Sequence, residues 1–367
     1  MPSDPRIVLD CRWLNSGGAG RLTELILRGL ARTPAEAGWI LWGPESVAEL
    51  AWPGARLVVE TGDPRAAYGQ RHWFRVPDCD LVLFMHQQRP LRRGPSVTYI
   101  HDTIPLHFTP NPVARRLKRQ YLRAAARLSR QVLTPSEYSR RCVLDDLAIP
   151  PGRVTRICPP ADRTMAERVS ALRRSASAEP FALYLGLFLP HKNLDRLIEA
   201  FGRTSFRAGG GRLVIMGGRP AEHAALTARL SPGQREYCEI RPFAGQDELE
   251  AALAACRFLV QPSLEEGFGL PAWEALSCGI PLCCSDGGSL PEITGEWADP
   301  FPAASTEAMT AALDSSAVRA AAAGPEQRDR ASARFLQTAP TLESHAAELV
   351  GVLDRALPGR PGTRPVD

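Results

Sequence analysis

Several features are missing from this 367-residue sequence, and each absence removes a class of protein. No run of consecutive apolar residues reaches the roughly 20 that a membrane-spanning helix needs. The first residues, 1–6, lack the basic start and apolar stretch of a signal peptide, so we expect a cytoplasmic protein. None of the nine cysteines forms a Cys-x-x-Cys pair, which argues against zinc ribbons and disulfide frameworks.

Lysine is also nearly absent, since Lys118 and Lys192 are the two lysines among 44 basic residues. A lysine in so arginine-rich a chain therefore needs a local reason. The charge is also uneven: residues 1–160 hold 23 Lys and Arg against 14 Asp and Glu, an excess of +9, and the rest carries −5. Such an excess predicts that the first half meets something anionic, such as a membrane surface, a phosphorylated ligand or nucleic acid.

What is present is an ordinary globular composition, with 44% hydrophobic and 23% charged residues in a length that predicts two domains. The chain opens with a strand at 6–10, a glycine loop at 16–20 and a helix at 21–31, as a doubly wound α/β domain does. Further apolar runs predict strands at 40–42, 56–59, 81–84, 97–100 and 131–134.

A second alternation of strands and helices starts at Phe181. It predicts strands at 181–185, 212–216, 239–242, 258–260 and 281–285, with helices at 193–201, 221–230, 247–255 and 270–277. We therefore expect an α/β protein of two Rossmann-like domains facing an interdomain cleft, with ligands at the carboxyl ends of the strands. The expected divisions are a domain at 1–160, a linker at 161–180, a domain at 181–340, a C-terminal helix at 341–357 returning to the first domain, and a tail at 358–367.

The segment from Glu265 to Leu276 carries the most chemistry. It follows an apolar strand, and its glycines and Pro271 predict a tight turn that opens a helix. The amides of Phe268, Gly269 and Leu270 would then form an anion-binding helix N-terminus. Glu266 and Glu274 flank that terminus, an arrangement that suits a nucleotide sugar; the other interpretation is a capped helix with two solvated glutamates.

The spacing of these two glutamates matches the E-x7-E motif, and the residues around it, from Pro262 to Pro281, resemble glycosyltransferase family 4. The resemblance implies the GT-B fold and transfer of a sugar from a nucleotide-diphosphate donor with retention of configuration. It also implies roles: Glu266 contacts sugar hydroxyls, Glu274 the ribose, and the amides of Phe268, Gly269 and Leu270 the diphosphate.

The loop ending Pro190-His191-Lys192-Asn193 resembles a family segment that ends Pro-Arg-Lys-Asn. The resemblance implies that Lys192 neutralises the diphosphate as the leaving group gains charge. His191 replaces the family's arginine, which removes a permanent phosphate donor, so Arg21 is a candidate for that task. With an ordinary pKa near 6.5, a histidine on the diphosphate predicts donor binding that weakens from about pH 6 to pH 8.

The first half of the chain holds further candidates. The resemblance places Gly17 and Gly18 near the donor phosphate or the acceptor, whereas the residues by themselves favour a tight structural turn. His101 follows a strand and, in the family, reaches the donor sugar near its O6; the other interpretation is a histidine satisfied by loop backbone. The motif Asp78-Cys79-Asp80 has the metal-binding D-x-D form, but a polar start of a strand explains it. A polar helix end explains Asp145-Asp146 in the same way. We therefore expect neither a metal nor a cofactor.

The stretch from Arg115 to Arg130 repeats arginine every four residues, which predicts a basic helix face. That face is either solvated or in peripheral contact with the inner membrane surface. The apolar residues of the helix, such as Leu117, either join this contact or pack in the core. No nucleic-acid reader motif accompanies the charge, so we expect no nucleic-acid partner.

The resemblance implies a metal-independent retaining hexosyltransferase. The segments Ser289–Ile293 and His101–Pro105 resemble the mannosyl- and rhamnosyltransferase branch, which makes GDP-mannose the first donor, with UDP- and dTDP-sugars behind it. The expected acceptor is a glycan, a lipid-linked glycan or a natural product. The alternatives are a catalytically impaired nucleotide-sugar-binding partner or regulator, which rests on His191, and a GT-B epimerase or phosphorylase.

Overall fold

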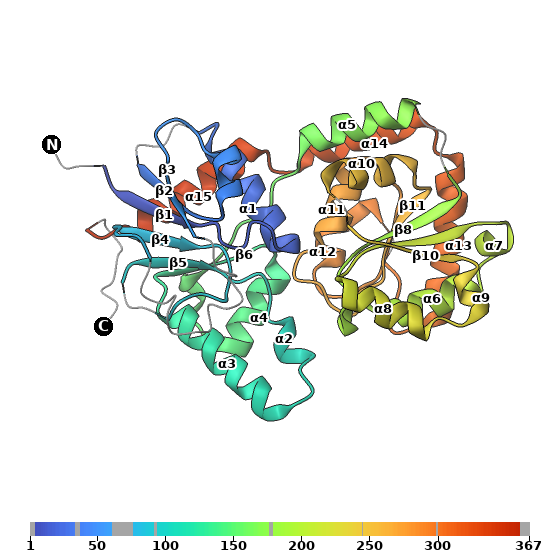
Figure 1. The fold of residues 1–367 in the computed structure, drawn as a ribbon, viewed down its shortest axis with the longest axis horizontal. Helices are drawn as coiled ribbons and strands as arrows, with labels where there is room; N and C mark the ends of the chain where they lie inside the picture. Colours follow the sequence, from blue (N-terminus) through green and yellow to red (C-terminus); the bar gives the residue numbers. More distant parts are fainter. Residues whose placement is uncertain are drawn as a thin grey trace. The chain divides into compact units, whose positions relative to one another are not determined.

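The structure is a computed structural model that describes residues 4–33, 37–60, 76–91, 94–175, 179–243, 245–298 and 300–359. The chain forms two compact units, Met1–Pro160 with Pro340–Asp367, and Ala161–Ala339 (Figure 1). Each unit contains one parallel sheet, so the predicted α/β class with two Rossmann-like sheets is confirmed. From residue 360 onward the predicted tail lies outside the described residues.

The first unit contains a seven-stranded parallel sheet in the order β3-β2-β1-β4-β5-β6-β7. The order reverses between β1 and β4, which makes their carboxyl ends the place where such a sheet binds ligands. The strands are β1 (Arg6–Asp10), β2 (Gly38–Gly43), β3 (Arg56–Val59), β4 (Leu81–Phe84), β5 (Ser96–Tyr99), β6 (Gln131–Thr134) and β7 (Val154–Arg156).

Alternate residues of these strands enter opposite cores, as the period of two in a strand requires. Ile7 and Leu9 of β1 share a core with α1 and α15, whereas Val8 packs with Trp42 and Phe84 on the other face. The helices of this unit are α1 (Gly17–Leu30), η1 (Glu45–Leu50), α2 (Ile104–His107), α3 (Pro112–Arg127), α4 (Glu137–Leu147), η4 (Pro151–Arg153) and α15 (Leu342–Ala356).

The second unit contains a five-stranded parallel sheet in the order β10-β9-β8-β11-β12, which reverses between β8 and β11. Its strands are β8 (Phe181–Gly186), β9 (Arg212–Gly217), β10 (Cys238–Arg241), β11 (Phe258–Gln261) and β12 (Leu282–Cys284). Its helices are α5 (Arg163–Ser175), η5 (Pro190–Lys192), α6 (Leu194–Gly202), α7 (Ser205–Ala208), α8 (Pro220–Arg229), α9 (Pro232–Arg235), α10 (Gln246–Ala255), α11 (Leu270–Ser277), α12 (Leu290–Thr294), η6 (Gly295–Trp297), α13 (Thr306–Ala322) and α14 (Pro325–Thr338).

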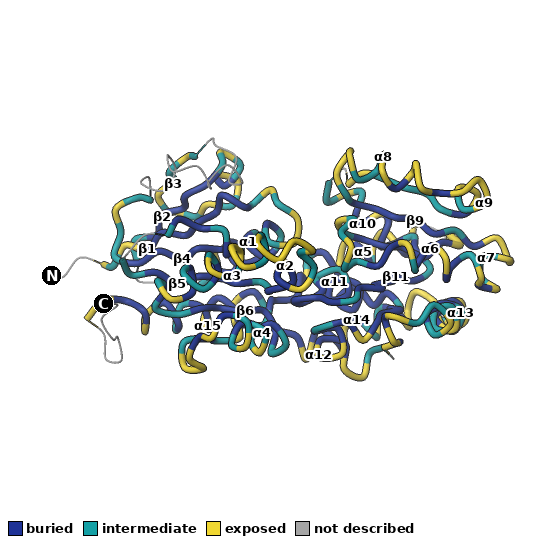
Figure 2. Tube along the Cα trace, turned by 90° about the horizontal axis from the view of Figure 1, so that it is seen from below, coloured by how far each residue is buried: buried dark blue, intermediate teal, exposed yellow. Residues whose placement is uncertain are grey.

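In both units the central strands are buried, whereas the edge strands β3 and β10 are partly exposed (Figure 2). In the second unit, Tyr184 and Ile215 point into a core closed by α6 and α13. On the other face α11 packs on α14, and α5 packs on α10 and α14.

Two expectations from the sequence differ from the structure. The segment expected as a linker, 161–180, contains helix α5, which buries Met165, Val169 and Arg173 at intervals of four. A stripe this narrow on an otherwise polar helix leaves little hydrophobic pattern in the sequence. The expected loop at 16–20 is also shorter, because α1 already begins at Gly17.

Candidate active site

The strongest candidate site lies in the second unit, at the reversal point of its sheet. After β8 the chain makes the short helix η5, which holds His191 and Lys192. After β11 it runs through Ser263 and Glu266 and enters α11 at Leu270. Because β8 and β11 are neighbours in a parallel sheet, both loops leave the same edge.

Lys192 and Glu266 meet at this edge, although 74 residues separate them in the sequence. The Lys192 Nζ donates to Oε1 of Glu266 at 2.7 Å and to Oε2 at 2.9 Å. Oε1 also accepts from Gln261 Nε2 at 2.5 Å and from Ser263 Oγ at 2.6 Å. Within the described residues, Oε2 accepts from Lys192 alone, so it is the oxygen that remains open to a further donor.

This network keeps Glu266 ionised. Burial by itself would raise the pKa of this carboxyl, because only 5% of the residue is exposed. The charge of Lys192 and the hydrogen bonds from Lys192 and Ser263 outweigh burial and hold the pKa of Glu266 below its ordinary value. The site therefore presents a carboxylate and an ammonium side by side at neutral pH.

Hydrogen bonds from the Asn193 side chain and from one backbone amide join the two loops. Asn193, in the left-handed conformation with φ 62°, donates through Nδ2 to the carbonyls of Pro262 at 3.0 Å and Ala303 at 2.9 Å. Leu264 donates its amide to the carbonyl of His191 at 2.7 Å. These bonds fix the position of the Lys192 stem relative to the segment that carries Glu266.

The N-terminus of α11 completes the site. Its first turn follows Gly269, which has φ +88°, and a Cβ there would lie 2.8 Å from Leu290 Cδ2. The conformation therefore favours glycine, and a side chain here would also displace the end of Leu290. No side chain caps the terminus, which leaves its amides to other acceptors. Phe268 is buried edge-on against Trp273, with ring centroids 5.2 Å apart, and Glu274 is buried one turn into the helix.

His191 differs from the expectation of an ordinary pKa. Burial and the positive charge of Lys192 lower its pKa to about 4, against a smaller opposing effect of Glu266. The imidazole is consequently neutral at pH 6 to 8 in the unliganded protein. The expected weakening of donor binding from pH 6 to pH 8 concerns the complex with the diphosphate and stays a prediction.

The sequence-predicted residues of the first unit lie at its own sheet edge. Gly17 and Gly18 form the first turn of α1, and Gly17 has φ +50°. His101 follows β5, and its Nε2 donates to the carbonyl of Met85 at 2.9 Å. One ring nitrogen of His101 is thus satisfied by loop backbone, as one of the two interpretations anticipated.

Asp78, Asp80 and Asp146 have structural partners. Asp78 forms an ion pair with Arg6 at 2.8 Å, and Asp80 accepts the Arg6 amide at 2.7 Å. Asp146 accepts from Thr103 at 2.6 Å and from His107 at 2.9 Å. Over the described ranges, no group of three or more His, Cys, Asp or Glu side chains is arranged to hold a metal ion.

The basic helix α3 turns a different face outward than the arginine spacing suggests. Arg123 donates through Nε to the carbonyl of Leu147 at 3.0 Å and so packs against α4. Val113 and Leu117, one turn apart, are each 66% exposed, so Leu117 is not in the core. Arg116 is exposed on the same side of the helix. In the part of the chain that the structure describes, no helix is long and apolar enough to cross a membrane.

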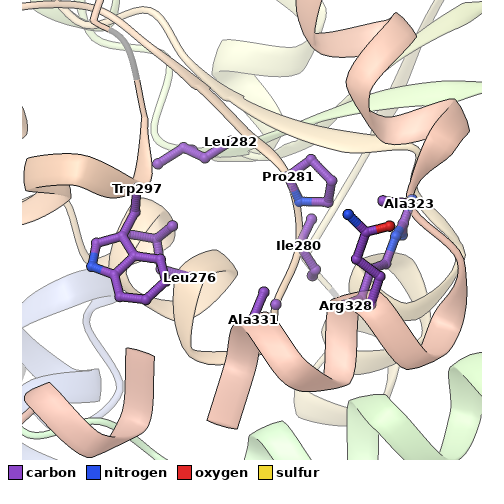
Figure 3. A pocket seen from close by; sticks show the side chains of 10 residues that line it. Leu276, Ile280, Pro281, Leu282, Trp297, Ala323, Arg328 and Ala331 are labelled. Atoms are coloured by element: carbon purple, nitrogen blue, oxygen red, sulfur yellow. The ribbon is translucent and has the colours of Figure 1, made fainter. Parts of the chain in front are cut away.

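A pocket of about 150 Å³ lies at the other end of α11, beside the start of β12 (Figure 3). Leu276, Ile280, Leu282 and Trp297 supply most of its apolar lining. Arg328 reaches its rim, but donates to the carbonyls of Cys256 at 3.2 Å and Arg257 at 3.0 Å. We assign no ligand to this pocket.

Three residues of the site were not singled out from the sequence. Gln261 and Ser263 hold Glu266, and Asn193 joins the two loops. Each lies within or beside a segment whose likeness to family 4 was noted. Only the folded chain shows that their side chains point at the carboxylate or at the neighbouring loop.

Two family models match the chain. The model "Glycosyl transferases group 1" matches residues 169–330, and "Glycosyltransferase Family 4" matches residues 16–164. The O-antigen chain mannosyltransferase B of Escherichia coli is 32% identical over 222 residues, 56% of this chain and 57% of that protein. The MMP alpha-(1->4)-mannosyltransferase of Mycolicibacterium hassiacum is 29% identical over 46% of this chain and 41% of that protein.

Solved structures show the same fold at lower identity. Sucrose-phosphate synthase from Thermosynechococcus elongatus has a TM-score of 0.74 and 16% identity, covering 96% of this chain and 98% of that one. Anabaena HepE in complex with UDP-glucose has a TM-score of 0.73 and 16% identity, covering 95% and 99%.

These matches define the class as glycosyltransferases of the GT-B fold. The two family models together cover most of the sequence, and the chain belongs to the group 1, family 4 glycosyltransferases. The aligned part spans about half the length, or less, of the curated relatives named above.

Proposed function

We propose that this protein transfers a hexose from a nucleotide-diphosphate sugar to a glycan acceptor, with retention of configuration and without a divalent metal. The Lys192–Glu266 pair beside the open N-terminus of α11 carries the proposal. A nucleotide sugar needs cationic and N–H groups at its diphosphate and acceptors at its hydroxyls. This edge of the second unit offers both within one network.

Lys192 would hold the diphosphate as its leaving oxygen gains negative charge. The Nζ has three N–H donors, and in the unliganded protein it spends two on Glu266. The amides at the start of α11 would share the phosphate charge, aided by the helix dipole. A positioned donor of this kind contributes about 2.7–4 kcal/mol to stabilising a transition state.

Glu266 would bind sugar hydroxyls rather than attack the sugar. Its Oε1 accepts three hydrogen bonds and its pKa is lowered, both of which reduce its nucleophilicity. We therefore favour front-face displacement. The bond from the sugar C1 to the phosphate oxygen breaks, the acceptor oxygen bonds to C1 on the same face, and the acceptor proton passes to the leaving phosphate.

GDP-mannose is the proposed donor, because the relatives named above include mannosyltransferases. The O-antigen relative suggests an acceptor on a polysaccharide or lipid-linked glycan. The alternative, a binding protein without catalysis, rests on His191 alone. The ion pair between Lys192 and Glu266 favours a glycosyltransferase over a binding protein without catalysis.

A panel of GDP-, UDP- and dTDP-sugars tests the proposal. The donor should raise the melting temperature, because a ligand that binds only the folded state stabilises it. Slow hydrolysis of the same donor should follow. A donor that stabilises the protein but is neither hydrolysed nor transferred would favour the binding-protein alternative. Activity that is lost in EDTA and restored by magnesium or manganese would contradict metal independence.

We further propose that α3 rests on an anionic membrane surface. Its exposed face places Val113 and Leu117 beside Arg116, an apolar strip with flanking cations. Such a contact would bring the protein to a lipid-linked acceptor. Binding of the purified protein to vesicles with anionic lipid, weakened by salt, tests this localisation.

A further inference from the structure

The ammonium of Lys192 is already in use before any ligand binds. An ammonium has three N–H groups. Lys192 donates two of them to Glu266, at 2.7 Å to Oε1 and at 2.9 Å to Oε2. The side chain of Lys192 is 16% exposed and that of Glu266 is 7% exposed, so the pair is largely shielded from water. A diphosphate that binds here therefore competes with Glu266 for the N–H groups of one lysine.

Lys192 is the cation that compensates the charge of Glu266. His191 also lies near this carboxylate, but burial and the charge of Lys192 lower the pKa of its imidazole to about 4, so it is neutral at pH 7. Burial, with a smaller effect of Glu266, raises the pKa of Tyr184 on β8 well above its ordinary value, so its phenol is neutral as well. The electrostatic state of Glu266 thus depends on where the N–H groups of Lys192 point.

The two oxygens of Glu266 differ in what holds them apart from Lys192. Oε1 also accepts from Gln261 Nε2 at 2.5 Å and from Ser263 Oγ at 2.6 Å, and both of these residues are buried. They belong to the same segment as Glu266, so a ligand that draws Lys192 away leaves them in place. Oε2, by contrast, accepts from Lys192 alone among the residues that the structure describes. The carboxylate would therefore keep its orientation while Oε2 changes partner.

A diphosphate at Lys192 changes Oε2 in two ways. An oxygen that shares its charge with an ammonium is a weaker acceptor for a second donor, so the departure of the ammonium makes Oε2 a stronger acceptor for a sugar hydroxyl. The carboxylate and the phosphates then also lie close to one cation, and in a site with little water their repulsion is strong. A hydroxyl that donates to Oε2 stabilises the carboxylate against this repulsion.

We propose that Lys192 couples the two halves of the donor site and is a positioning residue for Glu266 as well as a ligand of the diphosphate. In the unliganded protein it holds Oε2, and when a diphosphate takes its N–H groups it leaves Oε2 to a sugar hydroxyl. The nucleotide half and the sugar half of one donor then assist each other. A nucleoside diphosphate without the sugar leaves Oε2 with no donor beside its phosphates. The inference rests on the proposed function, since it takes the diphosphate to bind at Lys192 and the hydroxyl at Glu266.

Calorimetric titration of GDP into Glu266→Gln tests the coupling, with UDP and dTDP titrated in parallel. The amide keeps the size of the side chain but carries no charge, so it does not repel the phosphates and holds the ammonium less strongly. We expect the nucleoside diphosphate to bind this variant about tenfold more tightly than the wild type. The advantage of the nucleotide sugar over the nucleoside diphosphate should shrink. Affinity for the nucleoside diphosphate that is unchanged or weaker in Glu266→Gln would overturn the inference.

Glu296→Gln is the matched control, because it removes the same charge from the same unit away from the site. Glu296 pairs with Arg334 at 2.7 Å and is 67% exposed. Its loss should change the affinity for GDP by less than about twofold. Tightening of equal size in both variants would show that net charge is responsible and would also overturn the inference. If none of the three nucleoside diphosphates binds the wild type or Glu266→Gln, the proposed function itself fails, and the inference fails with it.

The pH dependence of kcat/KM separates coupling from a phosphate contact alone. In Lys192→Met the buried carboxylate loses its compensating cation, so the pKa of Glu266 in the free protein should rise. The carboxylate form binds the hydroxyl, and a raised pKa depletes that form as the pH falls. Lys192→Met should therefore lose more activity, relative to the wild type, at pH 6 than at pH 8. Lys192→Arg keeps the cation and should keep the acid limb of the wild-type profile.

An equal proportional loss at pH 6 and pH 8 in Lys192→Met would assign Lys192 to the diphosphate alone and contradict the coupling. The pH profile decides if Glu266→Gln does not fold, and the titrations decide if Lys192→Met has no measurable turnover.

Discussion

Single residues decide the charge of the candidate site. Oε1 of Glu266 takes three donors while Oε2 takes one, so the carboxylate is anchored on one side. An anchored carboxylate costs less entropy when it binds a hydroxyl, because its rotamer is already fixed. The residues that anchor it should then matter for turnover without touching substrate.

Ser263 allows this to be tested. Ser263→Ala removes one hydrogen bond to an ionised group, an interaction of about 1.5–3 kcal/mol, so we expect kcat to fall at least about tenfold. Ser263→Thr keeps the hydroxyl and should recover part of the rate. Glu266→Gln should be the more severe change, losing about 100-fold or more. Ser175→Ala, on the exposed end of α5, serves as the control, and an unaltered kcat in Ser263→Ala would refute the anchoring role.

His191 provides a prediction about pH. Its pKa of about 4 means that it gains no charge between pH 8 and pH 6, so the donor affinity of the wild type should be flat over that range. His191→Arg adds a permanent cation and should tighten donor binding about tenfold at pH 8. Calorimetric titration of intact nucleotide sugar at pH 6, 7 and 8 measures both. Wild-type affinity that falls steadily towards pH 8 would show that the bound diphosphate protonates His191.

At the scale of elements, the start of α11 depends on one glycine. Gly269→Ala places a side chain in the left-handed conformation and against Leu290, so it should cost about 1–2 kcal/mol of stability or more and weaken donor binding. Gly210→Ala is the matched control, with φ +90° and open space around its Cβ. It should lose similar conformational energy and keep donor affinity. Equal donor affinity in both variants would show that the N-terminus of α11 does not bind the diphosphate.

Helix α3 provides the second prediction at this scale. The double variant Val113→Thr, Leu117→Gln should bind anionic vesicles about tenfold more weakly, because it removes exposed apolar area beside the cations. Val318→Thr is the control, since Val318 is 72% exposed on α13 of the other unit. Vesicle sedimentation at two salt concentrations measures the effect. Unchanged binding in the double variant would leave α3 as a solvated helix.

Elements with strong local patterns were predictable from the sequence. Short apolar runs indicated most strands, and α11 was expected with its observed bounds, Leu270–Ser277. The strand β7 was not predicted, because its three residues carry little hydrophobic pattern. The helix α5 was not predicted either, because its few buried residues are separated by polar and charged ones.

The site was predictable only in part, for a similar reason. The turn before α11 and the E-x7-E motif indicated Glu266, and the resemblance to family 4 indicated Lys192. The tautomer of His101 could not be predicted, because the backbone carbonyl of Met85 sets it.

At the scale of the whole molecule, buried neutral histidines should make the protein sensitive to acid. The pKa of His345 is lowered to about 4 by burial, against a smaller effect of the Cys158 carbonyl, and its buried Nε2 has no partner among the described residues. Between pH 6.5 and pH 4 the unfolded chain binds more protons there than the folded one, so stability falls as the pH falls.

His345→Asn tests this sensitivity. Asparagine can still donate to the Cys158 carbonyl but does not titrate, so the loss of stability in acid should shrink by up to about 1.4 kcal/mol per pH unit. Urea unfolding from pH 4.5 to pH 7.5 gives the slopes. A variant slope equal to that of the wild type would show that carboxylates alone govern acid unfolding.

The course of the chain through its two units has a consequence for how the protein is made. The second unit is continuous, from Ala161 to Ala339, whereas the first takes its last helix, α15, from the far end of the chain. Leu349, Val352 and Leu353 of α15 belong to the same core as Ile7 and Leu9 of β1. On a ribosome, residues of β1 emerge hundreds of codons before the helix that covers them. The unit that is synthesised first is therefore the one whose core is completed last, and until then one face of its sheet depends on chaperones or on partial structure for cover.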